Sequence, residues 1–252
     1  MKRNKLRSLT LTSVLSAIII LMTFVPQLGY ITLGITEMTL IHIPVLIGVF
    51  LLEKRYSIFL GLLFGVTSLI KALQINAGMA IAFINPLVSV LPRLLFVLVA
   101  YYIFKLLKLL ATKKHGDIFL FSFVSFITIF GIHYGIKAVN DFTAWNETLL
   151  NVISLILMVL VINVYFAYIK QAKAEKTLYA SVLLISTVLH TLLVLFAALI
   201  FAKTTLVEVF QTTDIVGILI SIALTNGLVE ALLASFIGTP IIIALLNLKE
   251  GA

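Results

Sequence analysis

The chain has 252 residues, of which 62% are hydrophobic and 11% are charged. This composition is far from that of soluble domains and predicts an all-α polytopic membrane protein, because about 20 apolar helical residues cross the hydrocarbon core of a bilayer. The absence of cysteine excludes disulfides, thiolate metal sites and a cysteine nucleophile. The net charge of +8 comes largely from basic residues in short loops, which indicates membrane topology and not binding to nucleic acid.

We predict eight transmembrane helices, in a chain without a separate soluble domain. The predicted segments are 8–25, 38–53, 57–73, 84–108, 117–135, 148–169, 177–202 and 214–247. The first resembles the apolar part of a signal peptide, but no small-residue cleavage site follows it, so we expect it to be retained. With eight segments, most loop lysines and arginines fall on the side of the two termini, which predicts that both termini are cytoplasmic.

The first segment and the loop after the third segment each contain a candidate binding feature. Ser13 and Ala17 are four residues apart, so they share a helix face and let another helix approach closely. Packing inside the protein is the alternative explanation. Gln74 and Asn76 lie in a predicted outer loop, where their amides could bind or gate a ligand. Trp145, in a later outer loop, fits an interfacial anchor.

The fourth segment contains a polar stripe of Asn85, Ser89 and Arg93, which are four residues apart and share one helix face. An arginine near the middle of a membrane helix is costly, so it faces protein, water or a ligand instead of lipid. A guanidinium offers two parallel donors to a carboxylate, which favours an anionic ligand that enters from outside. A structural ion pair with a buried acid is the alternative.

The last two segments contain His190 and the pair Asn226 and Glu230. A buried glutamate is stable only if it is paired or protonated, so Glu230 could pair with Arg93, bind a ligand or carry a proton. A single histidine among leucines is more often a packing residue, and His42 and His133 are weaker candidates still. No HxxxH, HExxH or Walker A spacing occurs, so we expect no metal, no cofactor, no ATP hydrolysis and no enzymatic activity.

Four runs of the sequence together resemble a known transporter family. These runs are LIHIPVLIG at 40–48, GLLFGVTSLI at 61–70, FINPLVSVLPR at 83–93 and TNGLVEA at 225–231. They are similar to the substrate-binding (S) components of energy-coupling factor (ECF) vitamin transporters, and most of all to the pantothenate- and folate-type branch.

The resemblance implies a single transmembrane domain whose six-helix core is formed by 1–110 and 177–247. The chain departs from the family by an inserted helical hairpin at about 117–170. It implies a non-enzymatic subunit in the plasma membrane of a bacterium that binds a water-soluble vitamin from outside. Pantothenate is the first expectation, then folate or another B vitamin. The implied partners are a transmembrane coupling protein and two cytoplasmic ATPases.

The resemblance also gives the candidate residues roles. Ser13 and Ala17 match the position that docks on the coupling protein, and the loops 27–37 and 74–83 match loops that gate the site. The expected substrate-binding residues are Arg93, Ser89, Asn85, Asn226, Glu230, His190, Asn76 and Gln74.

Two other functions are compatible with the same residues. An ion-coupled secondary transporter would use Glu230 and His190 as a proton relay. A membrane assembly or regulatory protein would need no small-molecule ligand.

Overall fold

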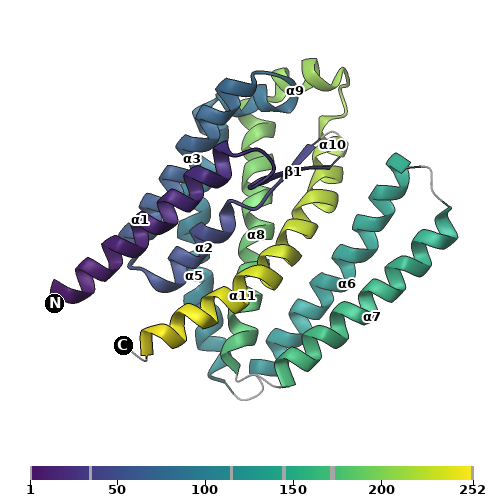
Figure 1. The fold of residues 1–252 in the computed structure, drawn as a ribbon. Coiled ribbons are helices and arrows are strands. Elements are labelled where there is room, and N and C mark those ends of the chain that lie inside the picture. The colour runs from purple at the N-terminus through teal and green to yellow at the C-terminus, as the bar shows by residue number, and fades with distance from the viewer. Residues whose placement is uncertain (1, 34–35, 114–115, 144–145, 171–173, 251–252) are drawn as a thin grey trace. The chain divides into compact units, whose positions relative to one another are not determined.

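The computed structural model describes residues 2–33, 36–113, 116–143, 146–170 and 174–250 (Figure 1). The chain forms two compact units. The first consists of Met1–Tyr102 and Leu189–Leu219, and the second consists of Ile103–Val188 and Ile220–Ala252. Two long helices, α5 (Leu91–Ala111) and α8 (Ala174–Phe201), therefore contribute residues to both units.

The first unit begins with a long helix, a short β-hairpin and two further helices. The N-terminal elements are α1 (Lys2–Phe24), β1 (Tyr30–Leu33), β2 (Thr36–Thr39), α2 (His42–Leu51) and α3 (Lys54–Ile75). The two strands are antiparallel, with Tyr30 opposite Thr39. The unit continues with the 3₁₀ helix η1 (Gly78–Ile84) and the short helix α4 (Pro86–Ser89), and its C-terminal part includes α9 (Lys203–Phe210) and the beginning of α10 (Ile215–Ile222).

Helix α1 packs against α3 through one face. Its buried residues are Thr12, Leu15, Ile19 and Thr23, which recur at the three- and four-residue spacing of one helical stripe. The hydroxyl groups of Thr23 and Thr67 meet across this interface at 3.3 Å. The short helix α2 differs from α1, because every residue from His42 to Val49 is buried. A helix that is apolar on all sides is expected in such a position.

Two glycines bring α3 very close to the segment that contains α4 and the start of α5. A Cβ atom on Gly65 would lie 2.8 Å from the Cα of Val90, and a Cβ on Gly61 would lie 3.1 Å from the carbonyl oxygen of Arg93. Gly61 and Gly65 have the GxxxG spacing that permits close contact between membrane helices. This contact places the backbone around Arg93 directly against α3.

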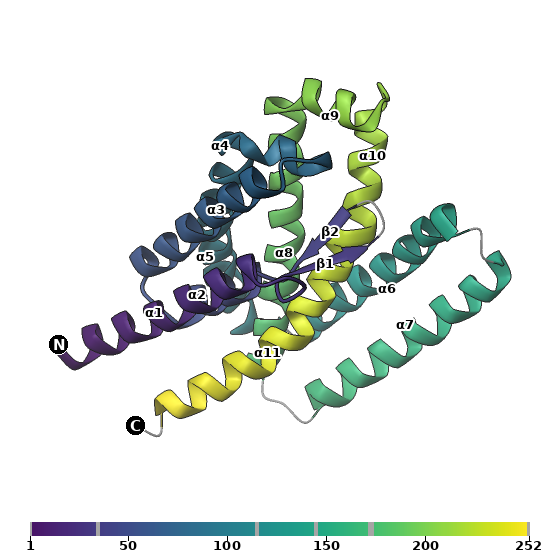
Figure 2. The same cartoon turned by 45° about the horizontal axis from the view of Figure 1, so that its top comes forward.

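The second unit contains the helical hairpin of α6 (Gly116–Thr143) and α7 (Glu147–Lys170), which run antiparallel side by side (Figures 1 and 2). Helix α6 also packs against the π-helical turn η2 (Ala223–Gly227) and against α11 (Leu228–Glu250). The hydrophobic core of this contact consists of Val124, Leu184 and Ala231, with partly buried residues around them. The hairpin is therefore packed onto helices of its own unit.

Five helical segments among the described residues are long and apolar enough to cross a membrane: 5–24, 54–75, 86–111, 177–201 and 228–248. A sixth is present if α9 and α10, which meet at an 87° bend, form one broken span. Shorter apolar helices lie at His42–Leu51, Ile118–Phe130 and Thr148–Leu160. The membrane-protein class is therefore confirmed, while the total of eight spans and the cytoplasmic termini stay predictions.

The structure differs from the predicted second span, 38–53. Its first residues belong to β2, and α2 has only 10 residues, or about 15 Å of helix at 1.5 Å per residue. That length is about half of the hydrocarbon core, so α2 does not cross it alone. The hairpin of β1 and β2 is also a departure from the all-α prediction, which otherwise describes the fold.

The predicted outer loops contain more regular structure than expected. The loop 27–37 contains β1 and the first two residues of β2, 74–83 contains most of η1, and the loop between the last two predicted segments contains α9. In the predicted loop 136–147, α6 continues to Thr143, and Trp145 lies outside the described residues.

Candidate functional site

The candidate site is organised by the break between α4 and α5. Pro92 has no N–H group, so it cannot donate the helical hydrogen bond to the carbonyl of Val88 four residues earlier. The guanidinium Nη1 of Arg93 donates to this carbonyl instead, at 2.8 Å. The proline next to the arginine thus creates the acceptor that fixes the arginine side chain.

The other two members of the polar stripe have partners within the backbone. Asn85 caps α4, because its Oδ1 accepts a hydrogen bond from the backbone N–H of Leu87 at 3.0 Å. Its Nδ2 donates to the carbonyl of Phe201 at 3.2 Å, and the Ser89 hydroxyl donates to the Asn85 carbonyl at 3.2 Å. Asn85 and Ser89 therefore shape the start of the segment on which Arg93 lies.

Aromatic rings surround the Arg93 side chain, which is only 6% exposed. Its guanidinium carbon lies 5.5 Å from the ring centre of Phe64 in α3 and 5.2 Å from that of Phe83 in η1. Cation–π contacts of this kind are stronger where water is excluded. Three consecutive elements of the first unit thus hold the cation, and sequence reasoning had identified neither phenylalanine.

His190 lies in the same aromatic cluster. Its ring stacks on that of His42 at 5.6 Å and is 5.6 Å from Phe64 and 4.7 Å from Phe96. His190 and His42 are 4% and 0% exposed. His190 was a predicted site residue, whereas His42 had been ranked as a weak candidate. The structure brings the two histidines together although they are far apart in the sequence.

The β-hairpin contributes Tyr30 to this cluster. Burial raises the pKa of the Tyr30 hydroxyl above its ordinary value, while the Ser68 hydroxyl and the positive charge of Arg93 act in the opposite direction. The hydroxyl is therefore protonated at neutral pH and lies near both groups. We define the Arg93 cluster as Arg93, His190, His42, Phe64, Phe83, Phe96, Tyr30 and Ser68.

Four of the other predicted residues lie at exposed positions. Gln74 and Asn76 are exposed at the end of α3, and Asn76 ends this helix in the left-handed conformation, with φ 42°. Ser13 and Ala17 are exposed on the side of α1 that does not carry its buried stripe. They are therefore not internal packing residues, which was the alternative explanation of their spacing.

The remaining two predicted residues belong to the second unit. Asn226 is buried within the π-helical turn η2, and Glu230 is buried in the first turn of α11, with exposed fractions of 4% and 6%. A π-helical turn inside a helix is uncommon and often lies at a functional site. No local pattern in the sequence predicts this turn, although both polar residues stand out in their apolar segment.

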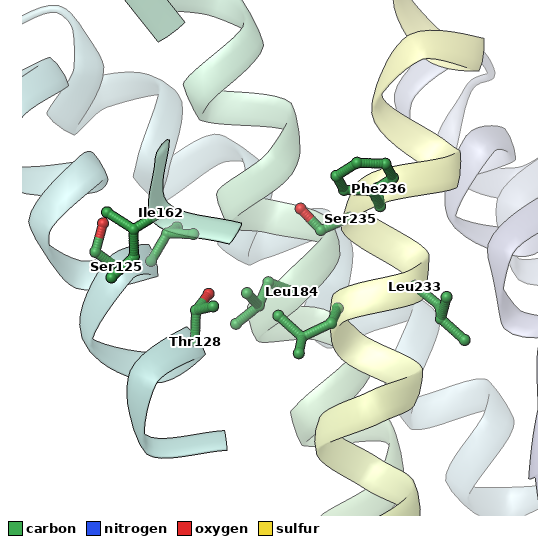
Figure 3. Close-up of a pocket in the computed structure, with 9 residues that line it drawn as sticks. Ser125, Thr128, Ile162, Leu184, Leu233, Ser235 and Phe236 are labelled. Atoms are coloured by element: carbon green, nitrogen blue, oxygen red, sulfur yellow. The ribbon is translucent and has the colours of Figure 1, made fainter. Parts of the chain in front are cut away.

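The second unit also contains a cavity of about 170 Å³ (Figure 3). Its lining residues are Val124, Ser125, Thr128, Ile162, Leu184, Leu232, Leu233, Ser235 and Phe236. None of these nine described residues is charged, and three hydroxyl-bearing residues provide its only polar side chains. This lining suits an apolar occupant and offers no cation to a carboxylate, in contrast to the Arg93 cluster.

Residues 7–137 match the family model of the ECF transporter substrate-specific component. The match covers more than half of the chain, and the chain belongs to this family. The fold agrees with that of a membrane-embedded subunit built from apolar helices. The family consists of transporter components and not of enzymes, as the sequence had indicated.

A pantothenate transporter, PanT, from Leuconostoc mesenteroides is 33% identical to this chain over 121 residues. The aligned region is 46% of this chain and 58% of the relative. The alignment thus spans less than two thirds of the relative's length.

Proposed function

We propose that this protein is the pantothenate-binding subunit of an ECF-type importer. In this proposal it binds the vitamin from outside the cell and passes it to a transmembrane coupling protein and two cytoplasmic ATPases. The observation that carries the proposal is Arg93, a buried cation fixed by Val88 and lined by two phenylalanine rings. The similarity to a pantothenate transporter supports the choice of vitamin.

The position of Arg93 suits a carboxylate ligand. Arg93 lies seven residues into the apolar segment 86–111, or about 10 Å along the helix. Electrostatic attraction and hydrogen bonds are strong at such a depth because water does not compete for the charge. Pantothenate has one carboxylate, and in our proposal Arg93 binds it. We expect the protein to lie in the plasma membrane with both termini in the cytoplasm. In this orientation the site around Arg93 is accessible from outside the cell.

The proposed contact with the coupling protein uses the exposed face of α1. Ser13 and Ala17 are both small and exposed, so another helix can approach the α1 backbone closely at these positions. The opposite face of α1 is occupied by α3. In this proposal α1 therefore joins the subunit to its partner with one face and to its own core with the other.

The proposal is tested by removing the charge of Arg93 and comparing two ligands. We expect Arg93→Met to weaken the binding of pantothenate at least about 30-fold, because the loss of one partner of a buried charged pair costs about 2–5 kcal/mol. The neutral alcohol pantothenol should lose much less affinity. Isothermal titration calorimetry of the purified proteins measures the affinity for both ligands. If Arg93→Met does not fold, Arg93→Lys, which keeps the charge, is tested instead.

Lys108→Met removes one positive charge from the exposed face of the same helix and is the matched control, which should bind pantothenate like the wild type. Equal weakening of both ligands by Arg93→Met would mean that Arg93 has a structural role only. Uptake into proteoliposomes driven by a pH gradient, without ATP or partner proteins, would favour the secondary transporter instead.

A further inference from the structure

The described residues of the first unit provide no hydrogen-bond partner for the ring nitrogens of His190. Its Nδ1 and Nε2 are both buried, and neither makes a hydrogen bond with any described residue. Buried polar atoms without partners are costly and few in native proteins, so each calls for a physical reason. Packing alone would be served by phenylalanine, which would fill the same aromatic cluster without this cost.

His190 lies beside Arg93 in a shared aromatic environment. The guanidinium carbon of Arg93 and the ring centre of His190 are 5.5 Å and 5.6 Å from the same Phe64 ring centre. Their separation is therefore no greater than the sum of these two distances. A ligand that contacts both side chains therefore need not be longer than this separation.

The imidazoles of His42 and His190 lie together, so they could bind a metal ion or form hydrogen bonds to a ligand. The rings of His42 and His190 are inclined by only 25° at a centre-to-centre distance of 5.6 Å. A nitrogen of each ring lies within 4.8 Å of a nitrogen of the other ring, but the neighbouring positive charge of Arg93 disfavours a metal cation there. The pair is better suited to hydrogen bonding, for which a neutral imidazole offers one donor and one acceptor.

We infer that the stacked imidazoles of His190 and His42 bind the uncharged, hydroxyl-bearing part of the ligand whose carboxylate is held by Arg93. This inference rests on the proposed function and extends it to a second recognition element. The ligand class it defines is a small carboxylate with a hydroxyl group within reach of both side chains. Pantothenate is such a molecule, because its acyl part carries two hydroxyl groups beyond the amide.

The inference predicts selectivity for the hydroxyl groups of the ligand. We expect the wild type to bind pantothenate at least about tenfold more tightly than the dideoxy analogue, in which both hydroxyls are replaced by hydrogen, because a buried hydrogen-bonding group is left unpaired with the analogue. His190→Phe preserves the aromatic packing and should reduce this ratio to near one. His190→Gln retains a donor and an acceptor and should keep part of it.

Isothermal titration calorimetry with both ligands measures the ratio, and binding of the dideoxy analogue shows that each variant is folded. His133→Phe, an exposed substitution of the same kind in α6, is the control and should leave the ratio unchanged. An unchanged ratio in His190→Phe, or equal weakening of both ligands, would overturn the inference. So would pantothenate binding that is abolished by EDTA and restored by Zn²⁺, because the nitrogens would then hold a metal.

The same data separate this inference from the proposed function. If the wild type does not bind pantothenate, the proposed function fails, and the recognition role of His190 fails with it. If the wild type binds and Arg93→Met loses its preference for the anionic ligand, but His190→Phe keeps the hydroxyl selectivity, only the role of His190 is wrong.

Discussion

The close contact of α3 with the segment before Arg93 predicts that Gly65→Ala is destabilising. A methyl group on Gly65 would lie 2.8 Å from the Cα of Val90, which is a backbone atom and cannot rotate away. Carbon atoms pack best at about 3.5–4.0 Å, so α3 and this segment would have to separate by roughly 1 Å. Val88, which binds the Arg93 side chain, and Ser89 lie in the segment that would move.

Two opposing terms set the size of the effect. Overpacking of a tight interface costs about 1–3 kcal/mol. Replacing glycine by alanine inside a helix returns about 1 kcal/mol. We therefore expect Gly65→Ala to lower the free energy of unfolding by about 0–2 kcal/mol. We also expect at least about tenfold weaker pantothenate binding. Residues that bind a ligand must stay within about 0.5 Å of their productive positions, and the segment before Arg93 would move by roughly 1 Å.

Stability is measured as thermal unfolding in detergent, which is monitored by size-exclusion chromatography of the heated protein. Binding is measured by calorimetric titration of pantothenate. Gly61→Ala is an internal comparison and should also be destabilising, because a Cβ there would lie 2.6 Å from Cγ2 of the β-branched Val97 and 3.1 Å from the carbonyl oxygen of Arg93. Val66→Ala, at an exposed position on the same helix, is the control. If Gly65→Ala melts at a higher temperature than the wild type and binds pantothenate equally well, the methyl group does not force α3 away from the segment before Arg93.

Two further predictions concern α1. Thr23→Val should lower the free energy of unfolding by about 0.5–1 kcal/mol, because it keeps the shape of the side chain but removes the hydrogen bonds of its hydroxyl with the Ile19 carbonyl and the Thr67 hydroxyl; detergent melting that matches the wild type would show that these bonds contribute nothing. Ala17→Leu should leave vitamin binding by the isolated subunit unchanged and reduce its co-purification with the ATPase module about tenfold or more, because a large side chain prevents close helix approach. Ile18→Leu is its control, and normal assembly of Ala17→Leu would place the docking surface elsewhere.

The sequence predicted the membrane class and most helices because both depend on local patterns. Long apolar runs mark α3, α8 and α11 regardless of their neighbours. The predicted second span, 38–53, contains the end of β2 and the 10-residue helix α2, and the sequence could not separate the two cases because a fully buried helix and a membrane span are both apolar on all sides. The hairpin of β1 and β2 depends on pairing between two short strands, for which four residues each give little signal.

The candidate site could be predicted only in part. Arg93 and His190 were found because charged or titratable residues are conspicuous in apolar segments. His42 and Phe64 were not assigned to the site, because nothing in the sequence says that α2, α3 and α8 bring their rings together. One signal was available, since the GxxxG spacing of Gly61 and Gly65 predicts a close helix contact, although not the partner helix.

Mass spectrometry of the ligand retained by the gently purified protein is the direct test that this subunit binds pantothenate. The protein is expressed in cells grown with pantothenate, purified in mild detergent and denatured to release bound small molecules. We expect the wild type to release pantothenate in a near-stoichiometric amount and Arg93→Met to release much less of it. Release of a different vitamin, or of no small molecule even when pantothenate is in excess, would contradict it.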